Sequence, residues 1–174
     1  MPNLESLDPI SKQAGKFLTF QLGVECYAVE ILKVQEIIGL LNITRVPKTP
    51  DFIRGVINLR GQVIPIVDLR LKFGFSKVEP TEKTCIVVVQ IITEQDRKTT
   101  MGILVDHVSE VMYISEEQMG ATPEFGFEVN TDYLLGLAKI NEKVIMLLNI
   151  DKVIKASDVL QMNKSDSKNN EWDS

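Results

Sequence analysis

Few residues of this sequence could take part in catalysis. His107 is the only histidine among the 174 residues, so a Ser-His-Asp triad would have to include it. It lies in the segment VDHVSEV, and the sequence contains no G-x-S-x-G motif to supply a nucleophile. A P-loop, a G-x-G-x-x-G fingerprint and an H-E-x-x-H motif are also missing. We therefore expect His107 to face solvent on a half-buried element.

Carboxylates and thiols offer no clearer active site. Paired acidic side chains can act as general acid and base without histidine. The candidates lie in amphipathic segments and are expected on a solvated face: Glu36, Asp68, Asp106 and Glu110. Cys26 and Cys85 stand alone, without a C-x-x-C motif or a Cys/His cluster, so we expect reduced thiols in the core and no disulfide or zinc. These residues predict a binding protein with no metal, no cofactor and no catalytic residue.

Composition excludes several classes of partner. The formal net charge is −5, from 19 basic and 24 acidic side chains, whereas nucleic acids and anionic membranes attract basic surfaces. The first residues, MPNLESLDPISKQAGK, contain no apolar core of a signal peptide. The longest apolar runs, such as CIVVVQII, have the length of a strand and are too short to cross a bilayer. We expect a cytoplasmic protein without direct membrane insertion.

Most of the chain has the pattern of β-strands. Alternation on both sides of Gly23 predicts a hairpin over residues 16–31. VINLRGQVIPIVDL predicts a second hairpin with its turn at Arg60-Gly61, and Pro65 inside it predicts an edge strand or a bulge. CIVVVQII predicts a buried strand, and YLLGLAKINEKVIMLLNI predicts a further hairpin.

Helical signals are short. ILKVQEII fits a short helix or a strongly twisted strand, and DFIRG predicts a helical turn that Asp51 opens and Gly55 closes. Residues 1–15 predict a flexible arm and residues 161–174 a disordered tail. A C-terminal helix with one apolar face is predicted by four residues: Val153, Ile154, Val159 and Leu160.

The chain contains an internal repeat. AVEILKVQEII aligns with GILVDHVSEVM, 74 residues later, and FIRGVINLRGQVIPIVDL aligns with YLLGLAKINEKVIMLLNI, 81 residues later. Two similar β-rich halves are therefore expected around a pseudo-twofold axis. The halves divide at about residue 80, into 16–80 and 81–160, with exchange of strands between them left open.

The repeat also indicates a binding surface. Valine and isoleucine residues recur at equivalent places and either fill the core of each half or form an exposed apolar surface: Val34, Ile37, Val108 and Val111. A groove between two similar halves could receive a partner helix. Arg60-Gly61 aligns with Asn141-Glu142, so the fold does not require an arginine at this turn. The arginine in one half is a hint of function.

Several of these stretches resemble the CheW coupling proteins of bacterial chemotaxis. They are FLTFQLGVECYAVEILKVQEII, TRVPKTPDFIRGVINLRGQVIPIVDLRLKFG, GILVDHVSEV and YLLGLAKINEKVIMLLNIDKV. The resemblance extends from about residue 16 to about residue 160, and IRGVINLRGQVIPIVDLR is its most specific part. The segment TEQDRKTT is longer than usual in the family and falls in a turn.

The resemblance implies two packed, five-stranded, SH3-like β-barrels with short helices. It implies an adaptor without catalytic activity that joins the regulatory domain of the histidine kinase CheA to the cytoplasmic tips of methyl-accepting chemoreceptors. Carried over by position, the kinase side would use Arg54 and Gly55, and Glu36 with Arg60 would form a charge pair. The receptor-binding groove would use Val34, Glu36, Ile37, Arg60, Gly61, Val108 and Val111.

Other classes remain as alternatives. A CheV-type protein would need a receiver domain after the coupling domain, and a kinase fragment would need histidine-bearing and ATP-binding domains; we expect neither. An enzyme on a β-barrel scaffold would need a pocket or cofactor that the sequence does not reveal, and the acidic charge disfavours a nucleic-acid-binding barrel.

Overall fold

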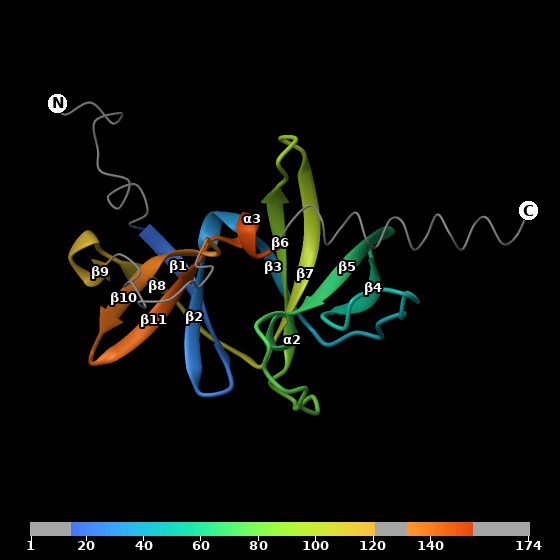
Figure 1. The fold of residues 1–174 in the computed structure, drawn as a ribbon, viewed down its shortest axis with the longest axis horizontal. Coiled ribbons are helices and arrows are strands. Elements are labelled where there is room, and N and C mark those ends of the chain that lie inside the picture. The colour runs from blue at the N-terminus through green and yellow to red at the C-terminus, as the bar shows by residue number, and fades with distance from the viewer. Residues whose placement is uncertain (1–14, 121–131, 155–174) are drawn as a thin grey trace, which may run out of the picture.

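The computed structural model describes residues 15–120 and 132–154, in eleven strands and four short helical turns. Figure 1 shows their arrangement. The strands are β1 Gly15–Leu22, β2 Glu25–Glu30, β3 Val34–Gly39, β4 Ile53–Leu59, β5 Gln62–Asp68, β6 Cys85–Ile92, β7 Lys98–Val105, β8 His107–Ile114, β9 Met119–Gly120, β10 Leu134–Ile140 and β11 Lys143–Leu148. The helical turns are η2 Ile31–Lys33, α2 Leu69–Lys72, η3 Glu116–Gln118 and α3 Ile150–Val153.

The strands form two sheets that lie beside each other (Figure 1). Sheet A has the order β8-β1-β2-β11-β10-β9, and sheet B has the order β3-β6-β7-β5-β4. All paired strands are antiparallel except β2 with β11 and β5 with β7. The predicted mainly-β class, with two sheets related by duplication and few short helices, is confirmed. Sheet B has the five strands that the resemblance implies, whereas sheet A has a sixth, the two-residue β9.

The two repeats exchange strands. In chain order and in the repeat alignment where it reaches, β1 to β5 of the first half correspond to β6, β7, β8, β10 and β11 of the second. Sheet A joins β1 and β2 to four strands of the second half, β8 to β11, of which the two-residue β9 has no counterpart in the first half. Sheet B joins β6 and β7 to three strands of the first half. The chain crosses between the sheets from β2 through η2 to β3, and again at Asp106 between β7 and β8.

Three apolar clusters hold the sheets together. One cluster lies within sheet A, around Phe17 and Ile145, and another lies within sheet B, around Ile64 and Ile86. The largest cluster is shared, since it combines residues of both sheets and of the helical turns α2 and α3. Strand β6 therefore buries both faces, which explains its unbroken apolar sequence CIVVVQII.

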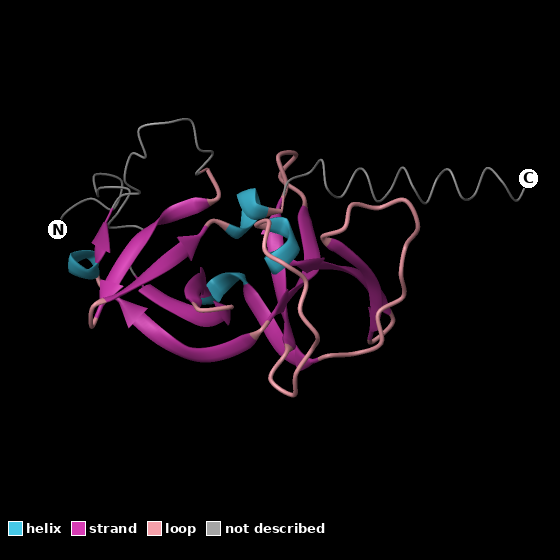
Figure 2. Ribbon diagram, turned by 60° about the horizontal axis from the view of Figure 1, so that its bottom comes forward, coloured by secondary structure: helices cyan, strands magenta, loops and turns pink. Residues whose placement is uncertain are grey.

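An ion pair ties each crossover to a short helical turn. Arg70 of α2 donates through Nη1 to Asp106 Oδ2 at 2.7 Å, and Lys33 of η2 donates through Nζ to Asp151 Oδ2 of α3 at 2.8 Å. Arg70 and Asp151 are equivalent in the repeat, so the positions of acid and base are reversed between the halves. Figure 2 shows the central helical turns between the two sheets.

Local predictions had mixed outcomes. The predicted hairpins are present as β1–β2, β4–β5 and β10–β11. The predicted helical turn over Asp51–Gly55 is wrong, because Ile53 and Gly55 already pair with β5. Pro65 lies in an interior strand instead of an edge strand, one residue before β5 begins to pair with β7, so it removes no donor from that ladder.

The C-terminal prediction is only partly covered by the structure. A short helical turn, α3, ends at Val153, and both Val153 and Ile154 are buried. Val159, Leu160 and the segments 1–14 and 161–174 lie outside the described residues. Within the described ranges, no helix is long and apolar enough to span a membrane.

Candidate partner-binding surface

The sequence places apolar residues at equivalent points of β3 and β8, and the structure separates them into two kinds. Val34 and Val108 are half-buried and pack against the shared cluster. Ile37 and Val111 face outward, with 46% and 51% of their surface exposed. The interpretation as core residues is therefore correct for Val34 and Val108, and the interpretation as exposed apolar surface is correct for Ile37 and Val111. The outer pair is available to a partner because neither side chain is needed to fill a core.

The turn between β4 and β5 presents an arginine in an unusual backbone conformation. Arg60 and Gly61 have φ of +51° and +85°, as a two-residue type I′ hairpin turn requires. The backbone N–H of Gly61 donates to Asn58 Oδ1 at 2.9 Å, which stabilises the turn. The equivalent turn at Asn141 and Glu142 also has positive φ at both positions. Asparagine adopts this region readily, whereas a long side chain does so less often.

Arg60 forms an ion pair with Glu36 across the two edges of sheet B. Glu36 lies on β3, and Arg60 follows β4, the strand at the opposite edge. The guanidinium Nη2 donates to Glu36 Oε1, so the sheet must curl until its edges meet. Mutual backbone hydrogen bonds between Thr44 and Val56, of 2.9 and 2.8 Å, cover the outer edge of β4 nearby. The Arg60 side chain is 71% exposed and the Glu36 side chain 29% exposed, so the pair can be reached from solvent.

A second charged pair lies at the base of the same hairpin. Arg54 on β4 donates through Nη1 to Asp68 Oδ2 at 3.1 Å, and Asp68 Oδ1 accepts from the backbone N–H of Leu71 at 3.3 Å. Asp68 thus caps α2 while it pairs with Arg54. Its burial contradicts the prediction of a solvated carboxylate, since only 5% of Asp68 is exposed.

The structure explains why position 55 is a glycine. A Cβ atom at this position would lie 2.1 Å from the carbonyl oxygen of Thr44, and the φ of +137° also disfavours a side chain. Gly55 is buried and lets the segment before β4 approach the strand closely. Of the two residues that the sequence assigned to the kinase side, Arg54 offers a side chain, and Gly55 shapes the backbone beside it.

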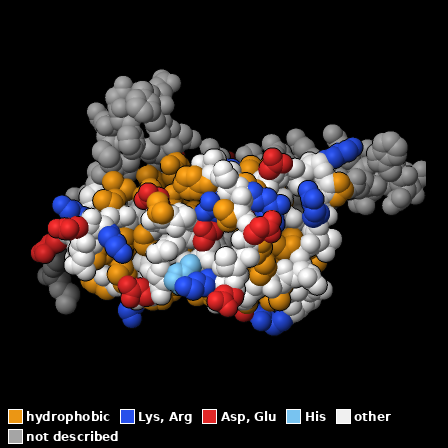
Figure 3. Space-filling view, turned by 90° about the horizontal axis from the view of Figure 1, so that it is seen from below, with side chains coloured by type: hydrophobic (Ala, Val, Ile, Leu, Met, Phe, Trp, Pro, Cys, Tyr) orange, Lys and Arg blue, Asp and Glu red, His pale blue; other side chains and the backbone are white. Residues whose placement is uncertain are grey.

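Of the candidate catalytic groups beside β8, the Asp106 carboxylate is occupied with structural contacts. Asp106, beside His107, accepts from both Arg70 and the backbone N–H of Gly23 at 2.7 Å. His107 begins β8, is partly exposed, and lies near the centre of the face in Figure 3, among mixed apolar and charged side chains. Glu110 is exposed, as predicted.

The cysteine thiols lie in partly buried positions. Burial is the main cause that raises the pKa of both Cys26 and Cys85 above the usual thiol value. Neutral, half-buried thiols are poor nucleophiles, in line with the expectation that these cysteines fill space. Both are free thiols.

Comparison with known proteins agrees with this geometry. The family model described as a CheW-like domain matches residues 16–158. The chain is 40% identical to the chemotaxis protein CheW of Klebsiella aerogenes, over 90% of this chain and 94% of that protein. It is 32% identical to the chemotaxis protein CheW of Bacillus subtilis, over 90% and 93% of the two chains.

A solved structure extends the likeness to the fold. The crystal structure of the scaffolding protein TtCheW from Thermoanaerobacter tengcongensis superposes with a TM-score of 0.72 at 32% identity, over 84% of this chain and 96% of that chain. Duplicated sheets, the N-L-R-G turn and similarity over most of the sequence lead to one conclusion. The chain belongs to the CheW-like domain family.

Proposed function

We propose that this protein is a chemotaxis scaffold that couples the histidine kinase CheA to the cytoplasmic tips of chemoreceptors and catalyses no reaction itself. Membership of the CheW-like family supports this function, because its relatives include proteins named for chemotaxis and for scaffolding. The adaptor would act in the cytoplasm, and its partners would recruit it to receptor arrays at the membrane.

Arg60 is the observation that carries this proposal. Its left-handed backbone, with φ of +51°, costs a non-glycine residue about 1 kcal/mol. An ion pair as exposed as Arg60 with Glu36 returns about 0–1 kcal/mol of stability. At the equivalent turn, Asn141 serves the fold without such a pair. Stability therefore does not account for the arginine, and contact with a partner carboxylate does, since the planar guanidinium can bind it through two hydrogen bonds.

The receptor side combines this pair with the apolar residues on the edge strands. Ile37 and Val111 would contact one face of the receptor's helical hairpin, with Val34 and Val108 behind them and Gly61 allowing close approach at the turn. Their partial exposure supports the assignment. Helical partners commonly lay an apolar face into such a groove and orient it with charges at the rim.

The kinase side is assigned to Arg54 and Gly55. Arg54 keeps a quarter of its side chain exposed while it pairs with Asp68, so it can contact a second carboxylate. Gly55 would contribute by holding the preceding segment against β4. This assignment separates the kinase contact from the receptor contact along one hairpin.

Two titrations test the proposal. In the first, the full chain is titrated calorimetrically with the regulatory domain of its cognate kinase. In the second, a receptor tip fragment is titrated into the wild-type chain, Arg60→Ala and the matched control Glu142→Ala. The two variants remove charged side chains from equivalent turns, both at positive φ.

We expect binding of the kinase domain at micromolar concentration or below, which corresponds to about −8 kcal/mol. The free energy of unfolding of Arg60→Ala should lie within about 1 kcal/mol of the wild-type value. This variant should bind the receptor fragment at least about tenfold more weakly, a change of about 1.4 kcal/mol in binding free energy. Glu142→Ala should bind normally. Equal receptor binding by both variants would refute the role of Arg60, and no binding of the kinase domain would refute the adaptor function.

A further inference from the structure

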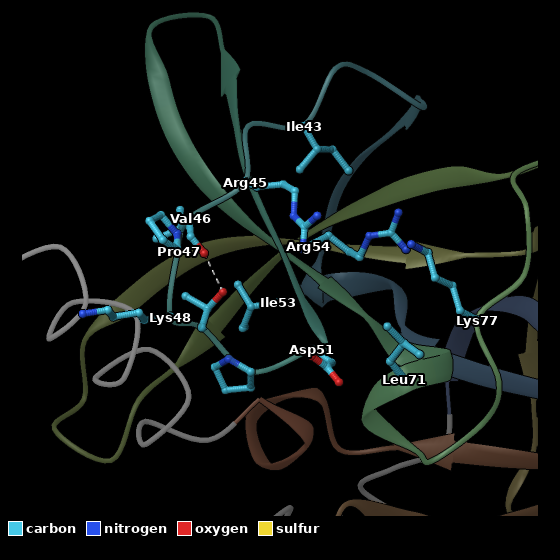
Figure 4. Close-up of a pocket in the computed structure, with 12 residues that line it drawn as sticks. Ile43, Arg45, Val46, Pro47, Lys48, Asp51, Ile53, Arg54, Leu71 and Lys77 are labelled. Carbon is cyan, nitrogen blue, oxygen red and sulfur yellow. Dashed lines mark hydrogen bonds between the residues drawn. The ribbon is translucent and has the colours of Figure 1, made fainter. Parts of the chain in front are cut away.

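The half built on sheet B contains a pocket that shares one residue, Arg54, with the proposed partner contacts. It has a volume of about 820 Å³, within the range of small-molecule sites. The segment between β3 and β4 forms one wall, and β4, α2 and the segment that follows α2 complete it (Figure 4). Neither Glu36 nor Arg60 lines this pocket.

The pocket concentrates positive charge in an acidic protein. The charged residues of its lining are four basic ones, Arg45, Lys48, Arg54 and Lys77, and one acidic one, Asp51, while the whole chain carries a net charge of −5. Asp68 pairs with Arg54. Among the described residues, Arg45 and Lys77 form no ion pair. Positive charge gathered in a concave site attracts anions more strongly than the same charge spread over a surface.

The backbone fixes the two arginines close to each other. The hydrogen bonds between Thr44 and Val56 hold the segment before β4 against that strand, so Arg45 and Arg54 flank the same bridge on neighbouring segments. In Figure 4, Arg45 and Lys77 extend toward Arg54 from different sides of the pocket. Like charges brought together repel one another, and a bound anion would relieve that repulsion.

The rest of the lining limits the kind of anion. Apolar side chains form much of the wall, among them Ile43, Val46, Ile53 and Leu71. Guanidinium groups bind carboxylate and phosphate groups through paired hydrogen bonds. We infer that the pocket binds a small organic anion, with a carboxylate or phosphate head among the cations and an apolar body against these side chains.

The repeat supports this inference by contrast. At the positions equivalent to Arg54 and Asp68, the other half has Leu135 and Asn149. The hairpin keeps the same register there, since Ile53 pairs with Val67 as Leu134 pairs with Leu148. The charge of Arg54 is therefore no requirement of the hairpin fold.

Calorimetric titration of the full chain tests the site with three probes: phenyl phosphate, benzoate and inorganic phosphate. The test variant is Arg45→Gln with Lys77→Gln. The control variant, Lys98→Gln with Lys143→Gln, removes two exposed cations outside the pocket. Arg54 stays intact, so the result is independent of the proposed kinase contact, and exposed substitutions of this kind should leave the fold intact.

We expect phenyl phosphate or benzoate to bind saturably at one site. The affinity should be about tenfold higher than that of inorganic phosphate, because the apolar body of the organic anion adds buried area. Preference for phenyl phosphate or for benzoate identifies the head group. The test variant should bind at least about tenfold more weakly, and the control variant should match wild type. The inference fails if neither organic anion binds, if inorganic phosphate binds equally well, or if both variants lose affinity equally.

Discussion

In the half built on sheet B, an arginine and a glutamate join the two edges of the sheet, whereas the other half has an exposed glutamate and an asparagine at the same places. Glu110 is equivalent to Glu36, and Asn141 is equivalent to Arg60. Both turns nevertheless have the same backbone conformation. The comparison teaches that the turn geometry is independent of the ion pair, so the fold does not require an arginine at this turn.

The same contrast recurs at the base of the hairpins. Arg54 and Asp68 form a partly buried ion pair, while Leu135 and Asn149 take their places in the second half. The ion pairs at the crossovers follow another pattern, because each half has one. The basic Arg70 of one half takes the place of the acidic Asp151 of the other. Both halves therefore have an ion pair at the crossover, whereas the ion pairs at the tip and at the base of the hairpin occur in one half only.

The largest expected difference between the halves concerns their equivalent glycines. A Cβ atom at Gly55 would meet the Thr44 carbonyl oxygen at 2.1 Å, and one at Gly136 would meet the Gly120 carbonyl oxygen at 2.6 Å. Gly55→Ala should lower the free energy of unfolding by about 3 kcal/mol, and Gly136→Ala by about 1–2 kcal/mol, since it has a single close contact.

Urea unfolding of the two variants measures this difference. Gly39→Ala is the control, because nothing lies within 4 Å of its Cβ position. Equal losses for Gly55→Ala and Gly136→Ala would show that the two close approaches are equally rigid, against our expectation.

An intermediate effect is expected at the capping position of α2. Asp68→Asn keeps the shape of the side chain and removes the charge that Arg54 contacts, so it should cost about 2 kcal/mol. Asn149→Ala should cost about 0.5 kcal/mol or less, because the Asn149 side chain makes no capping hydrogen bond.

The double variant Arg54→Leu with Asp68→Asn sharpens this comparison by copying the second half. The double variant should recover most of the stability that Asp68→Asn loses, so its free energy of unfolding should lie within about 1 kcal/mol of the wild-type value. A double-mutant cycle followed by thermal or urea unfolding measures this. A double variant less stable than Asp68→Asn alone would mean that Arg54 stabilises the fold without its partner.

The smallest expected effect depends on pH and concerns only one crossover. Burial is the main cause that raises the pKa of Glu30; the charge of Lys33 opposes it, and the charge of Asp151 adds a smaller increase. The equivalent residue in the other half is Leu104. A raised pKa in the folded state means that protonation favours folding. This contribution is complete below the ordinary value of 4.5 and is lost as the pH rises through the raised pKa.

Glu30→Gln should remove this dependence. Urea titration at several pH values measures the free energy of unfolding of wild type and Glu30→Gln. Wild type should lose stability relative to Glu30→Gln as the pH rises from below 4.5. A difference that moved in favour of wild type over this range would mean that the charge of Lys33 outweighs burial and lowers the Glu30 pKa instead.

The sequence predicted those parts of the fold that depend on local pattern. Alternation and turn residues predicted three hairpins, and the repeat predicted two similar sheets, because these signals lie within short stretches of chain. DFIRG was mistaken for a helical turn because its spacing also fits one, and pairing with β5 decided the outcome. The pairing of Glu36 with Arg60 came from family resemblance, and no local pattern would have indicated it.

Other features depend on contacts between distant segments. The burial of Asp68 depends on Arg54, fourteen positions earlier, and the pocket depends on the approach of two segments, one before β4 that carries Arg45 and one after α2 that carries Lys77. Asn58, which accepts from the Gly61 N–H, was missed although asparagine before a turn is a known signal for such a bond. Membership of each strand in sheet A or B could not be predicted, since periodicity records only which face of a strand is buried.

The exchange of strands between the repeats has a consequence for the ancestry of the molecule. The first repeat, taken alone, would hold two strands of sheet A and three of sheet B, and neither set would be complete. Two identical copies could complete both by trading strands, which is a domain-swapped dimer. The present chain has the topology that fusion of such a dimer would leave. Once the copies shared one polypeptide, each could change separately, which permits charge and recognition to differ between halves that still fold by the same plan.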